Sequence, residues 1–450
     1  MSSGSAHPRV AFYGDDFTGS VDALLQFSRR GWRARLFVGL PSQRLLEEAA
    51  ASSDAVGVAG IARSLPTEAL HDELIPVFEA LAALRPRMLQ YKACSTADSS
   101  PSTGSLGRVL ELGRRVVDTP TVPLLFAQPD FGRYTAFGHH FAAEGGVVHR
   151  LDRQPTMSTH PSTPMHESDL AVHLRAQTSL PIAGMPFTAY SSAEAVAEGL
   201  RHADAAALVL DAIDDAQLTL IGEALLQLPE PFFAIGSGGL SHAIAAAWPG
   251  PGGAVPERAV SDGPILAVSG SRSAQTRRQI RAAADAGWLV RPLLSSPQTD
   301  ADPIDEVTSA LRRGRSVVLA SDGLDGAGAP TGRTAPEQGA PEQVTPEQVT
   351  AGQVTLESIA ERAAELVSAV AHDGASRRIV VCGGDTSSRV TRLLGVDSLS
   401  IAANPWANIV VLNAHSHDPA IDGLELVLKG GQVGDDDFMT RLAAPAAARG

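Results

Sequence analysis

Short apolar runs alternate with longer amphipathic stretches along the first half of the chain. The run VAFYG at residues 10–14 is followed by SVDALLQFSRR, in which Val21, Leu24 and Leu25 share one helical face, and Gly31 stands where a helix can end. DAVGVAGIA and MLQYKAC are likewise each followed by a stretch with helical spacing. This alternation predicts a parallel sheet covered by helices.

The second half repeats this pattern after a break. Residues 251–263 are rich in Gly and Pro, as is typical of a linker, and a new alternation of strands and helices opens at ILAVSGSRSAQT. A chain of 450 residues also exceeds what one hydrophobic core usually supports. We therefore predict an α/β protein of two domains, residues 1–250 and 264–450, each a mainly parallel sheet flanked by helices.

A repeat interrupts the second predicted domain. The stretch APEQGAPEQVTPEQVTAGQVT repeats Pro and offers few apolar side chains to bury. It predicts a disordered surface insertion near residues 323–355. We expect deletion of Pro330–Gln353 to leave activity intact.

Composition narrows the class of partner. The composition, 44% hydrophobic and 19% charged, fits a globular protein, and the formal net charge of -14 argues against nucleic acid and anionic membranes, which require a basic surface. The two cysteines, Cys94 and Cys382, lie far apart and form no disulfide framework or zinc pattern. The opening MSSGSAHPR is small and polar, which argues against a secretory signal, and no apolar run approaches the length of a membrane span, so we expect a cytoplasmic location.

A pair of carboxylates stands on the first predicted loop. FYGDDFTGSVDA places Asp15 and Asp16 between an apolar strand and an amphipathic helix. Turn chemistry and helix capping are the ordinary explanation for such residues, and a catalytic or substrate-holding loop is the alternative. We expect Thr18 or Ser20 to cap a helix that begins near Val21, which would leave both aspartates available for chemistry.

Basic residues follow several predicted strands of the first half. Arg63 stands in GIARSLP, Lys92 ends MLQYK, and Arg133 stands in DFGRYTAFG. Ligands of α/β proteins bind at the carboxyl ends of parallel strands, and Arg and Lys there can hold a carboxylate. A solvated surface charge is the ordinary alternative for each of them. Lys92 is the hardest to explain in that way, because it follows an apolar strand.

Three later junctions share one design. AIGSGGLSH, AVSGSRSAQT and VVCGGDTSS each pass from an apolar strand through Gly to hydroxyl groups at a helix start, where backbone N–H groups can meet an anion. None has the GxxxxGK[ST] pattern, a clean GxGxxG or the GxSxG of serine hydrolases. An ordinary Gly helix start is the alternative for each. Asp385 in CGGDTS is either a helix cap or a residue that orders a metal-bound water or the loop.

Taken together, these motifs resemble the four-carbon acid sugar kinase family. GDDFTGSVDA, YKACSTADSS with GSLGR, QPDFGRYTAFG, HPSTPMHESDL, GSGGL, VSGSRSAQTRRQI, CGGDTSS and LKGGQVGDDDF occur in the family's order over nearly the whole chain. The resemblance implies an acid-sugar-binding first domain and a nucleotide-binding second domain. It also implies transfer of the γ-phosphoryl group of ATP, with Mg²⁺, to a terminal hydroxyl of a threonate-, erythronate- or 3-oxo-tetronate-type acid.

The resemblance also implies roles for individual residues. It places Asp15, Asp16, Arg63 and Lys92 around the substrate. From the chemistry of phosphoryl transfer we expect Asp15 or Asp16 to orient the acceptor hydroxyl and accept its proton, Arg63 and Lys92 to hold the substrate carboxylate, and Arg133 to be a further substrate-binding residue. No residue is assigned as a metal ligand. The residues expected around ATP are Ser271, Ser273, Gly383, Gly384, Asp385, Thr386 and Gly431.

The chain departs from the family pattern directly after Lys92. Many members have an Asp-Ser-Thr-Leu-Arg-Gly run there, whereas this chain reads CSTADSSPSTGSLGR and lacks the nearby Arg. An altered pocket keeps open a branched acid sugar such as 3-oxo-isoapionate as the substrate. An NAD-dependent oxidoreductase and a non-catalytic sugar-acid binding protein are the alternatives from other classes, and a homodimer is left open. The missing GxGxxG with its spaced acidic residue argues against the oxidoreductase.

Overall fold

The computed structural model describes residues 7–257, 262–294, 303–321, 355–406, 409–431 and 433–444, apart from the side chain of Asp385. The chain forms two compact units. Unit 1 comprises residues 1–256 and 397–401, and unit 2 comprises residues 257–396 and 402–450. The predicted insertion lies outside the described residues, except for Thr355, which caps the helix that follows.

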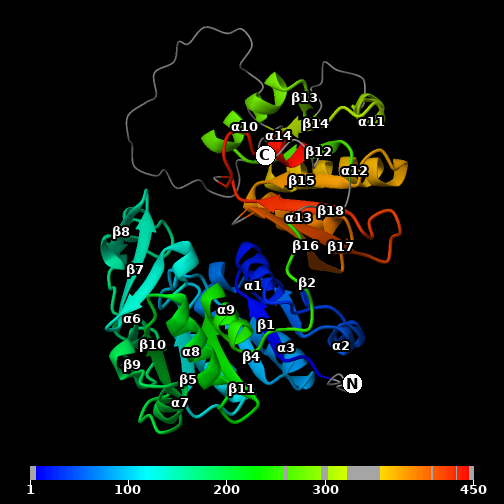
Figure 1. The fold of residues 1–450 in the computed structure, drawn as a ribbon. Coiled ribbons are helices and arrows are strands. Elements are labelled where there is room, and N and C mark those ends of the chain that lie inside the picture. The colour runs from blue at the N-terminus through cyan, green and yellow to red at the C-terminus, as the bar shows by residue number, and fades with distance from the viewer. Residues whose placement is uncertain are drawn as a thin grey trace. The chain divides into compact units, whose positions relative to one another are not determined.

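Eight strands of unit 1, from β2 at one end of the row to β9 at the other, pair in parallel (Figure 1). Each strand is a short apolar run, and most of the side chains in these runs are buried. In their order across the sheet the strands are β2 (Ala34–Val38), β3 (Ala55–Ala59), β1 (Val10–Gly14), β4 (Met88–Lys92), β11 (Phe232–Gly236), β5 (Val122–Leu125), β10 (Ala207–Leu210) and β9 (Ile182–Met185).

Helices cover both faces of this sheet. Helices α7, α8, α9 and α1 pack successively against one another on one face, while α2, α3, α4 and α6 contribute to the core on the other face. The helices of unit 1 are α1 (Phe17–Arg29), α2 (Gln43–Ser52), α3 (Leu70–Ala83), α4 (Leu106–Val116), α5 (Pro155–Ser158), α6 (Leu170–Arg175), α7 (Ala193–Arg201), α8 (Asp215–Leu225) and α9 (Gly238–Ala247). Short 3₁₀ helices are η1 (Ala62–Ser64), η2 (Thr67–Ala69), η3 (Pro129–Phe131), η4 (Leu151–Arg153) and η5 (Phe187–Ala189).

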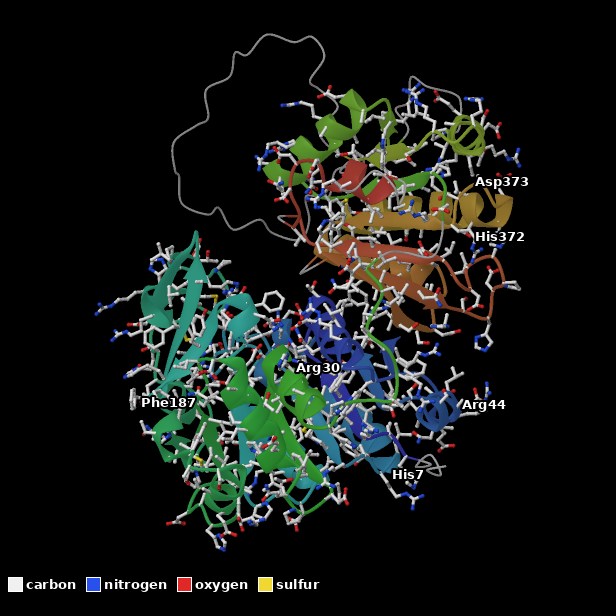
Figure 2. All side chains as sticks on the ribbon, viewed as in Figure 1. His7, Arg30, Arg44, Phe187, His372 and Asp373 are labelled. Atoms are coloured by element: carbon white, nitrogen blue, oxygen red, sulfur yellow. The ribbon has the colours of Figure 1, made fainter. Side chains whose placement is uncertain are left out.

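Strand β1 shows why these runs form central strands. All five of its residues are buried, and successive side chains point to opposite faces. Phe12 packs on Phe27 of α1, while Tyr13 packs edge-on against Phe78 of α3. Burial of each such aromatic ring stabilises the unit by about 1.5 to 3 kcal/mol. The outer face of the helical layers is polar, and Figure 2 shows Arg44 on α2, where it pairs with the exposed Glu48.

Unit 1 also contains antiparallel structure that the alternating pattern did not predict. Strands β6 (Arg133–Ala136), β7 (His139–Glu144) and β8 (Val147–Arg150) form a separate antiparallel sheet. The first residues of β16 (Ser398–Trp406) pair antiparallel with β2 and belong to unit 1. Strands β6, β7 and β8 span only four to six residues, so they carry little periodic signal. The pairing of β16 with β2 joins residues far apart in the sequence, which no local pattern specifies.

Unit 2 has the same architecture on a smaller scale. Its parallel strands are β13 (Leu289–Pro292), β14 (Val317–Ala320), β12 (Ile265–Ser269), β15 (Arg378–Cys382) and β18 (Glu425–Lys429), and β17 (Ile409–His415) joins β18 antiparallel. Helices α10 (Ala274–Asp285) and α14 (Phe438–Ala443) pack together, as do α11 (Ile304–Arg312), α12 (Leu356–Asp373) and α13 (Gly384–Leu393). The predicted α/β fold class, with mainly parallel strands flanked by helices in both units, is confirmed.

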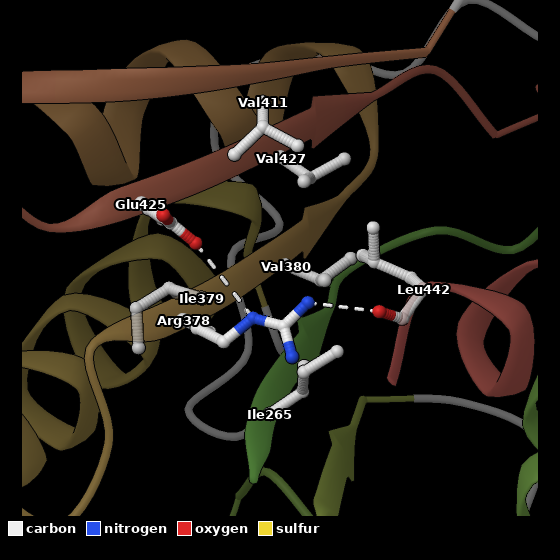
Figure 3. A pocket seen from close by; sticks show the side chains of 8 residues that line it. All are labelled: Ile265, Arg378, Ile379, Val380, Val411, Glu425, Val427 and Leu442. Atoms are coloured by element: carbon white, nitrogen blue, oxygen red, sulfur yellow. Dashed lines mark hydrogen bonds and ion pairs between the residues drawn. The ribbon is translucent and has the colours of Figure 1, made fainter. Parts of the chain in front are cut away.

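One small cavity lies at the amino ends of the strands in unit 2 (Figure 3). Its lining includes Arg378, whose guanidinium lies 3.7 Å from the Glu425 carboxylate and donates a 2.8 Å hydrogen bond to the Leu442 carbonyl. The volume of about 10 Å³ admits at most one water molecule. A cavity this small cannot hold a small-molecule ligand. The candidate ligand-binding residues lie at the opposite, carboxyl edge of the sheet.

Across the described helices, none is long and apolar enough to cross a membrane.

Candidate active site

The loop after β1 presents the paired aspartates at the carboxyl edge of unit 1. Helix α1 begins at Phe17, and the Asp16 side chain caps it by accepting a 2.7 Å hydrogen bond from the Gly19 N–H. The expectation that Thr18 or Ser20 caps a helix starting near Val21 is wrong. The helix starts earlier because Asp16 itself adopts an extended backbone and supplies the capping oxygen.

Arg63 binds both aspartates. It lies in η1, directly after β3, and its backbone N–H donates to the Asp15 carbonyl at 3.1 Å. Its guanidinium grips the Asp15 carboxylate with two hydrogen bonds, Nη2 to Oδ1 at 2.7 Å and Nε to Oδ2 at 3.2 Å, and reaches Asp16 through Nη1 at 2.7 Å. This bidentate geometry fixes the direction of both carboxylates.

The two aspartates differ in exposure. Asp15 is only 2% exposed, and both of its carboxylate oxygens accept hydrogen bonds from Arg63. Burial raises the pKa of the Asp15 carboxyl, and the positive charge of Arg63 opposes that rise. The Asp16 side chain is 32% exposed, so it is the aspartate that a ligand can reach.

Lys92 completes the group at the end of β4. Its side chain is 3% exposed, and its ammonium donates a 2.9 Å hydrogen bond to the Ala93 carbonyl. A Cβ atom on Gly19 would lie 3.0 Å from the Lys92 ammonium and 2.5 Å from Asp16, so a larger residue here would displace the ends of these two side chains. The structure thus brings Asp15, Asp16, Arg63 and Lys92 together, because β1 pairs in parallel with β3 and β4 and their carboxyl ends lie side by side.

Asp22 belongs to this group, although sequence reasoning missed it. Its Oδ2 lies 3.8 Å from the Lys92 ammonium, and its carboxylate accepts hydrogen bonds from Gln26 at 3.1 Å and from Gln128 at 3.3 Å. Asp22 stands three residues after Gly19 on α1, so the two share a helical face. That spacing within GDDFTGSVDA is the signal that could have identified it.

Arg133 takes a different position. It lies at the start of β6 and donates hydrogen bonds to the carbonyls of Phe131 in the preceding η3 at 2.7 Å and of Ala143 in the neighbouring β7 at 3.2 Å. Among the described residues of unit 1 it has no hydrogen bond or ion pair with Asp15, Arg63 or Lys92. Its predicted role with the substrate stays a prediction.

The divergent loop after Lys92 is anchored by the small antiparallel sheet and by α6. The Nε2 atom of His140 lies 2.7 Å from the Ser95 carbonyl oxygen, and its Nδ1 atom lies 2.9 Å from the Thr135 hydroxyl oxygen. Burial lowers the pKa of His140 to about 4, so the neutral ring donates to Ser95 and accepts from Thr135. Ser99 bonds to His173 at 3.0 Å. The shape of this loop therefore depends on residues far from it in the sequence.

In unit 2, the residues predicted around ATP gather at two strand-to-helix junctions. Ser273 caps α10 by accepting from the Thr276 N–H at 3.0 Å, and its hydroxyl donates to the Gly431 carbonyl at 2.5 Å. The Thr276 hydroxyl lies 3.2 Å from that of Ser271 and 2.9 Å from the Gly431 carbonyl. A Cβ atom on Gly431 would lie 2.7 Å from the Ser271 hydroxyl oxygen, so any larger residue here would displace that hydroxyl.

The second junction follows β15. Gly383 has a φ of 119°, a conformation that favours glycine, and α13 begins at Gly384. Thr386 is buried, and a Cβ atom on Gly383 would lie 3.0 Å from its hydroxyl and 3.5 Å from the Ser271 backbone nitrogen. Gly383, Thr386 and Ser271 therefore adjoin one another. The predicted role of the Asp385 side chain lies outside the described part of the chain.

Lys429 is a second residue that sequence reasoning missed. It ends β18 and is 2% exposed, with its ammonium 3.3 Å from the Thr276 hydroxyl and 3.2 Å from the Gly430 carbonyl. Burial lowers the pKa of this lysine. The signal was the one used for Lys92, a lysine at the end of an apolar strand, in LELVLK.

Comparison with known proteins decides the family. Residues 10–244 match the sugar-binding N-terminal domain and residues 266–439 match the nucleotide-binding C-terminal domain. A 3-oxo-isoapionate kinase from Paraburkholderia graminis is 36% identical over 95% of this chain and 93% of its own length. The chain belongs to the four-carbon acid sugar kinase family. Its predicted activity as an acid sugar kinase with a nucleotide-binding domain is thereby confirmed.

Other members of the family span the whole chain as well. A 3-oxo-tetronate kinase from Cupriavidus necator is 29% identical over 97% of this chain and 98% of its own length. A D-threonate kinase from Bordetella bronchiseptica is 26% identical over 97% of each. A solved Salmonella typhimurium structure, described as a putative tRNA synthase, has a TM-score of 0.76 at 22% identity and covers 97% of this chain and 98% of that one. That likeness shows the shared fold alone.

Proposed function

We propose that this kinase transfers the γ-phosphoryl group of ATP to a terminal hydroxyl of a small four-carbon acid sugar of the threonate, erythronate or 3-oxo-tetronate type. The observation that carries the proposal is the joining of Asp15, Asp16, Arg63 and Lys92 at the carboxyl edge of the sugar-binding domain. The carboxylates there can accept the proton of a substrate hydroxyl, and the two cations can bind the carboxylate of an acid.

Asp16 is the proposed proton acceptor. Its carboxylate is open to a ligand, and its hydrogen bonds to Gly19 and Arg63 hold it in one direction. Asp15 is enclosed and bidentately bound to Arg63, so we assign it to the positioning of that guanidinium. Phosphoryl transfer needs little more from the protein at this end than alignment of the hydroxyl and a place for its proton.

Arg63 and Lys92 are the proposed partners of the substrate carboxylate. The three hydrogen bonds of the Arg63 side chain to the aspartates use three of its five N–H donors, and its side chain remains 22% exposed. Two donors are therefore left for an acidic substrate. An acid sugar would meet these cations with its carboxylate and Asp16 with its hydroxyl end, because carboxylates repel one another.

The junctions around Ser271, Gly383 and Gly431 are the proposed ATP site. Backbone N–H groups at the start of α10 and α13 and the hydroxyls of Ser271 and Thr386 suit phosphate oxygens. The described residues contain no group of three His, Cys, Asp or Glu side chains that could hold a metal ion. Mg²⁺ commonly binds through substrate phosphates, and as a complex with ATP it would neutralise their charge here.

A branched acid sugar is the second candidate substrate. The relative with 36% identity is named 3-oxo-isoapionate kinase, whereas the 3-oxo-tetronate kinase from Cupriavidus necator has 29% identity. The altered loop after Lys92 is where this chain can differ from kinases of unbranched acids. The two candidates share the acid group and the terminal hydroxyl, so the same residues serve both.

Coupled ADP release separates these candidates. The purified full chain is assayed against threonate, erythronate, 3-oxo-tetronate and branched apionate-type acids, and turnover of one class alone identifies the substrate. Asp16→Asn should lower kcat by about 10²- to 10⁴-fold. Asp72→Asn, a change at a carboxylate that is 92% exposed, is the matched control and should not alter kcat. Absence of turnover across the panel, or an Asp16→Asn variant with wild-type kcat, would contradict the proposal.

A further inference from the structure

Lys429 is enclosed at the point where the strand-end loops of unit 2 meet. It is level with Cys382 across the parallel pair β15 and β18, and the Gly383 N–H donates to its carbonyl at 2.9 Å. Its ammonium donates to the Thr276 hydroxyl and to the Gly430 carbonyl, which are both neutral acceptors. The lysine therefore touches the segments that carry the proposed phosphate-binding groups.

No negative charge balances this ammonium within the described part of unit 2. Among the described residues, the Cys382 thiol is the titratable group that influences the Lys429 ammonium, and burial raises the pKa of that thiol, so the thiol is neutral. The face of the Phe438 ring lies 5.8 Å away. Other enclosed cations differ: Lys92 has Asp22 at 3.8 Å, and Arg378 has Glu425 at 3.7 Å. Enclosing a cation without a carboxylate beside it costs stability, and an anionic ligand would offset that cost.

The nucleotide supplies such an anion. The Thr276 hydroxyl connects the Lys429 ammonium with the Ser271 hydroxyl and the Gly431 carbonyl. We infer that Lys429 is a phosphate-binding determinant of this kinase: it positions Thr276 and the turn at Gly430, and it supplies the fixed positive charge that the phosphates of ATP meet. The inference rests on the proposed ATP site, and it assigns to the site a charge that its hydroxyls and glycines do not supply.

The number of phosphates on the ligand distinguishes this role from a structural one. Isothermal titration calorimetry on the full chain would compare ATP, ADP, AMP and adenosine with the wild type and with Lys429→Met. We expect the variant to lose about 10- to 100-fold in affinity for ATP, less for AMP and nothing for adenosine. A lysine that only fills space would change the affinity for all four ligands by the same factor.

Two further variants complete the design. Lys429→Gln keeps a donor for Thr276 and Gly430 but removes the charge, and it should reproduce the graded loss even if the Met variant fails to fold. Arg378→Met removes an enclosed cation at the opposite edge of the same sheet and should leave all four affinities unchanged (Figure 3). Equal losses for ATP and adenosine, or wild-type ATP affinity in a folded Lys429 variant, would overturn the inference. A wild type that binds no ATP would instead refute the proposed nucleotide site.

Discussion

Replacement of Arg63 by Met tests whether the enclosed aspartate depends on its guanidinium. The change removes three side-chain hydrogen bonds, two to Asp15 and one to Asp16. Met retains most of the length and apolar surface of the arginine stem, so the main perturbation is electrostatic. Asp15, 2% exposed, would lose its cation without gaining water.

The two contacts contribute unequally. Loss of the partner of an enclosed charge costs about 3 to 5 kcal/mol of unfolding free energy, whereas an ion pair as exposed as that of Asp16 contributes roughly 0.2 to 1 kcal/mol. We therefore expect Arg63→Met to destabilise unit 1 by about 3 to 5 kcal/mol at pH 7, which corresponds to about two to four powers of ten in the opening equilibrium.

The destabilisation should depend on pH. Burial raises the pKa of Asp15, and without Arg63 nothing of comparable strength opposes the rise. The folded variant then binds a proton at pH values at which the unfolded chain does not, so its stability falls as pH rises through this window. The loss caused by Arg63→Met should consequently be smaller at pH 5 than at pH 7.

Native-state hydrogen exchange read by mass spectrometry measures this effect locally. Amides of β1 and β3 should lose protection in Arg63→Met, while those of β15 in unit 2 serve as the internal reference. Asp15→Asn combined with Arg63→Met removes the enclosed charge as well, and should recover most of the protection and abolish its pH dependence. Unchanged protection of β1 in the single variant, or no recovery in the double variant, would refute the reasoning.

Two further predictions concern the loops. His140 has a pKa of about 4, so its neutral ring contributes about 3 kcal/mol to the free energy of unfolding above pH 6.5, and this contribution is lost as pH falls toward 4. In urea titrations, His140→Gln should lack this part of the pH dependence. Gly431→Ala places a Cβ atom 2.7 Å from the Ser271 hydroxyl and should raise the KM for ATP about 10-fold in the coupled assay. The control variant Gly253→Ala, whose added Cβ atom would lie in open space, should leave this KM unchanged. Equal KM values for the two variants would contradict the prediction.

The sequence predicted much of the site because strand ends are visible in it. Lys92 and Arg63 follow apolar runs, and parallel strands place such positions at one edge of a sheet, where the structure finds them. Asp22 and Lys429 carry similar signals, but whether each contributes to the site depended on contacts with Lys92 and Thr276 that no local pattern specifies.

The limits of local patterns also explain why the predicted start of α1 was wrong. Ser20 is a good capping residue, yet α1 begins at Phe17 because the Asp16 side chain accepts from Gly19 first. Both candidates are short polar residues ahead of an apolar face, and propensity does not choose between them. The pairing of Asp16 with Arg63, 47 residues away, holds the carboxylate at the position where it caps the helix.

The sequence by itself determined the alternation of strands and helices, the two α/β domains and the family, because apolar periodicity and motif order are properties of the sequence alone. Only the tertiary structure decided which aspartate is enclosed, that Lys92 and Lys429 are buried, and that Arg63 binds both carboxylates. These properties depend on burial and on distances between residues far apart in the chain, and electrostatic energy is set by those quantities rather than by residue type.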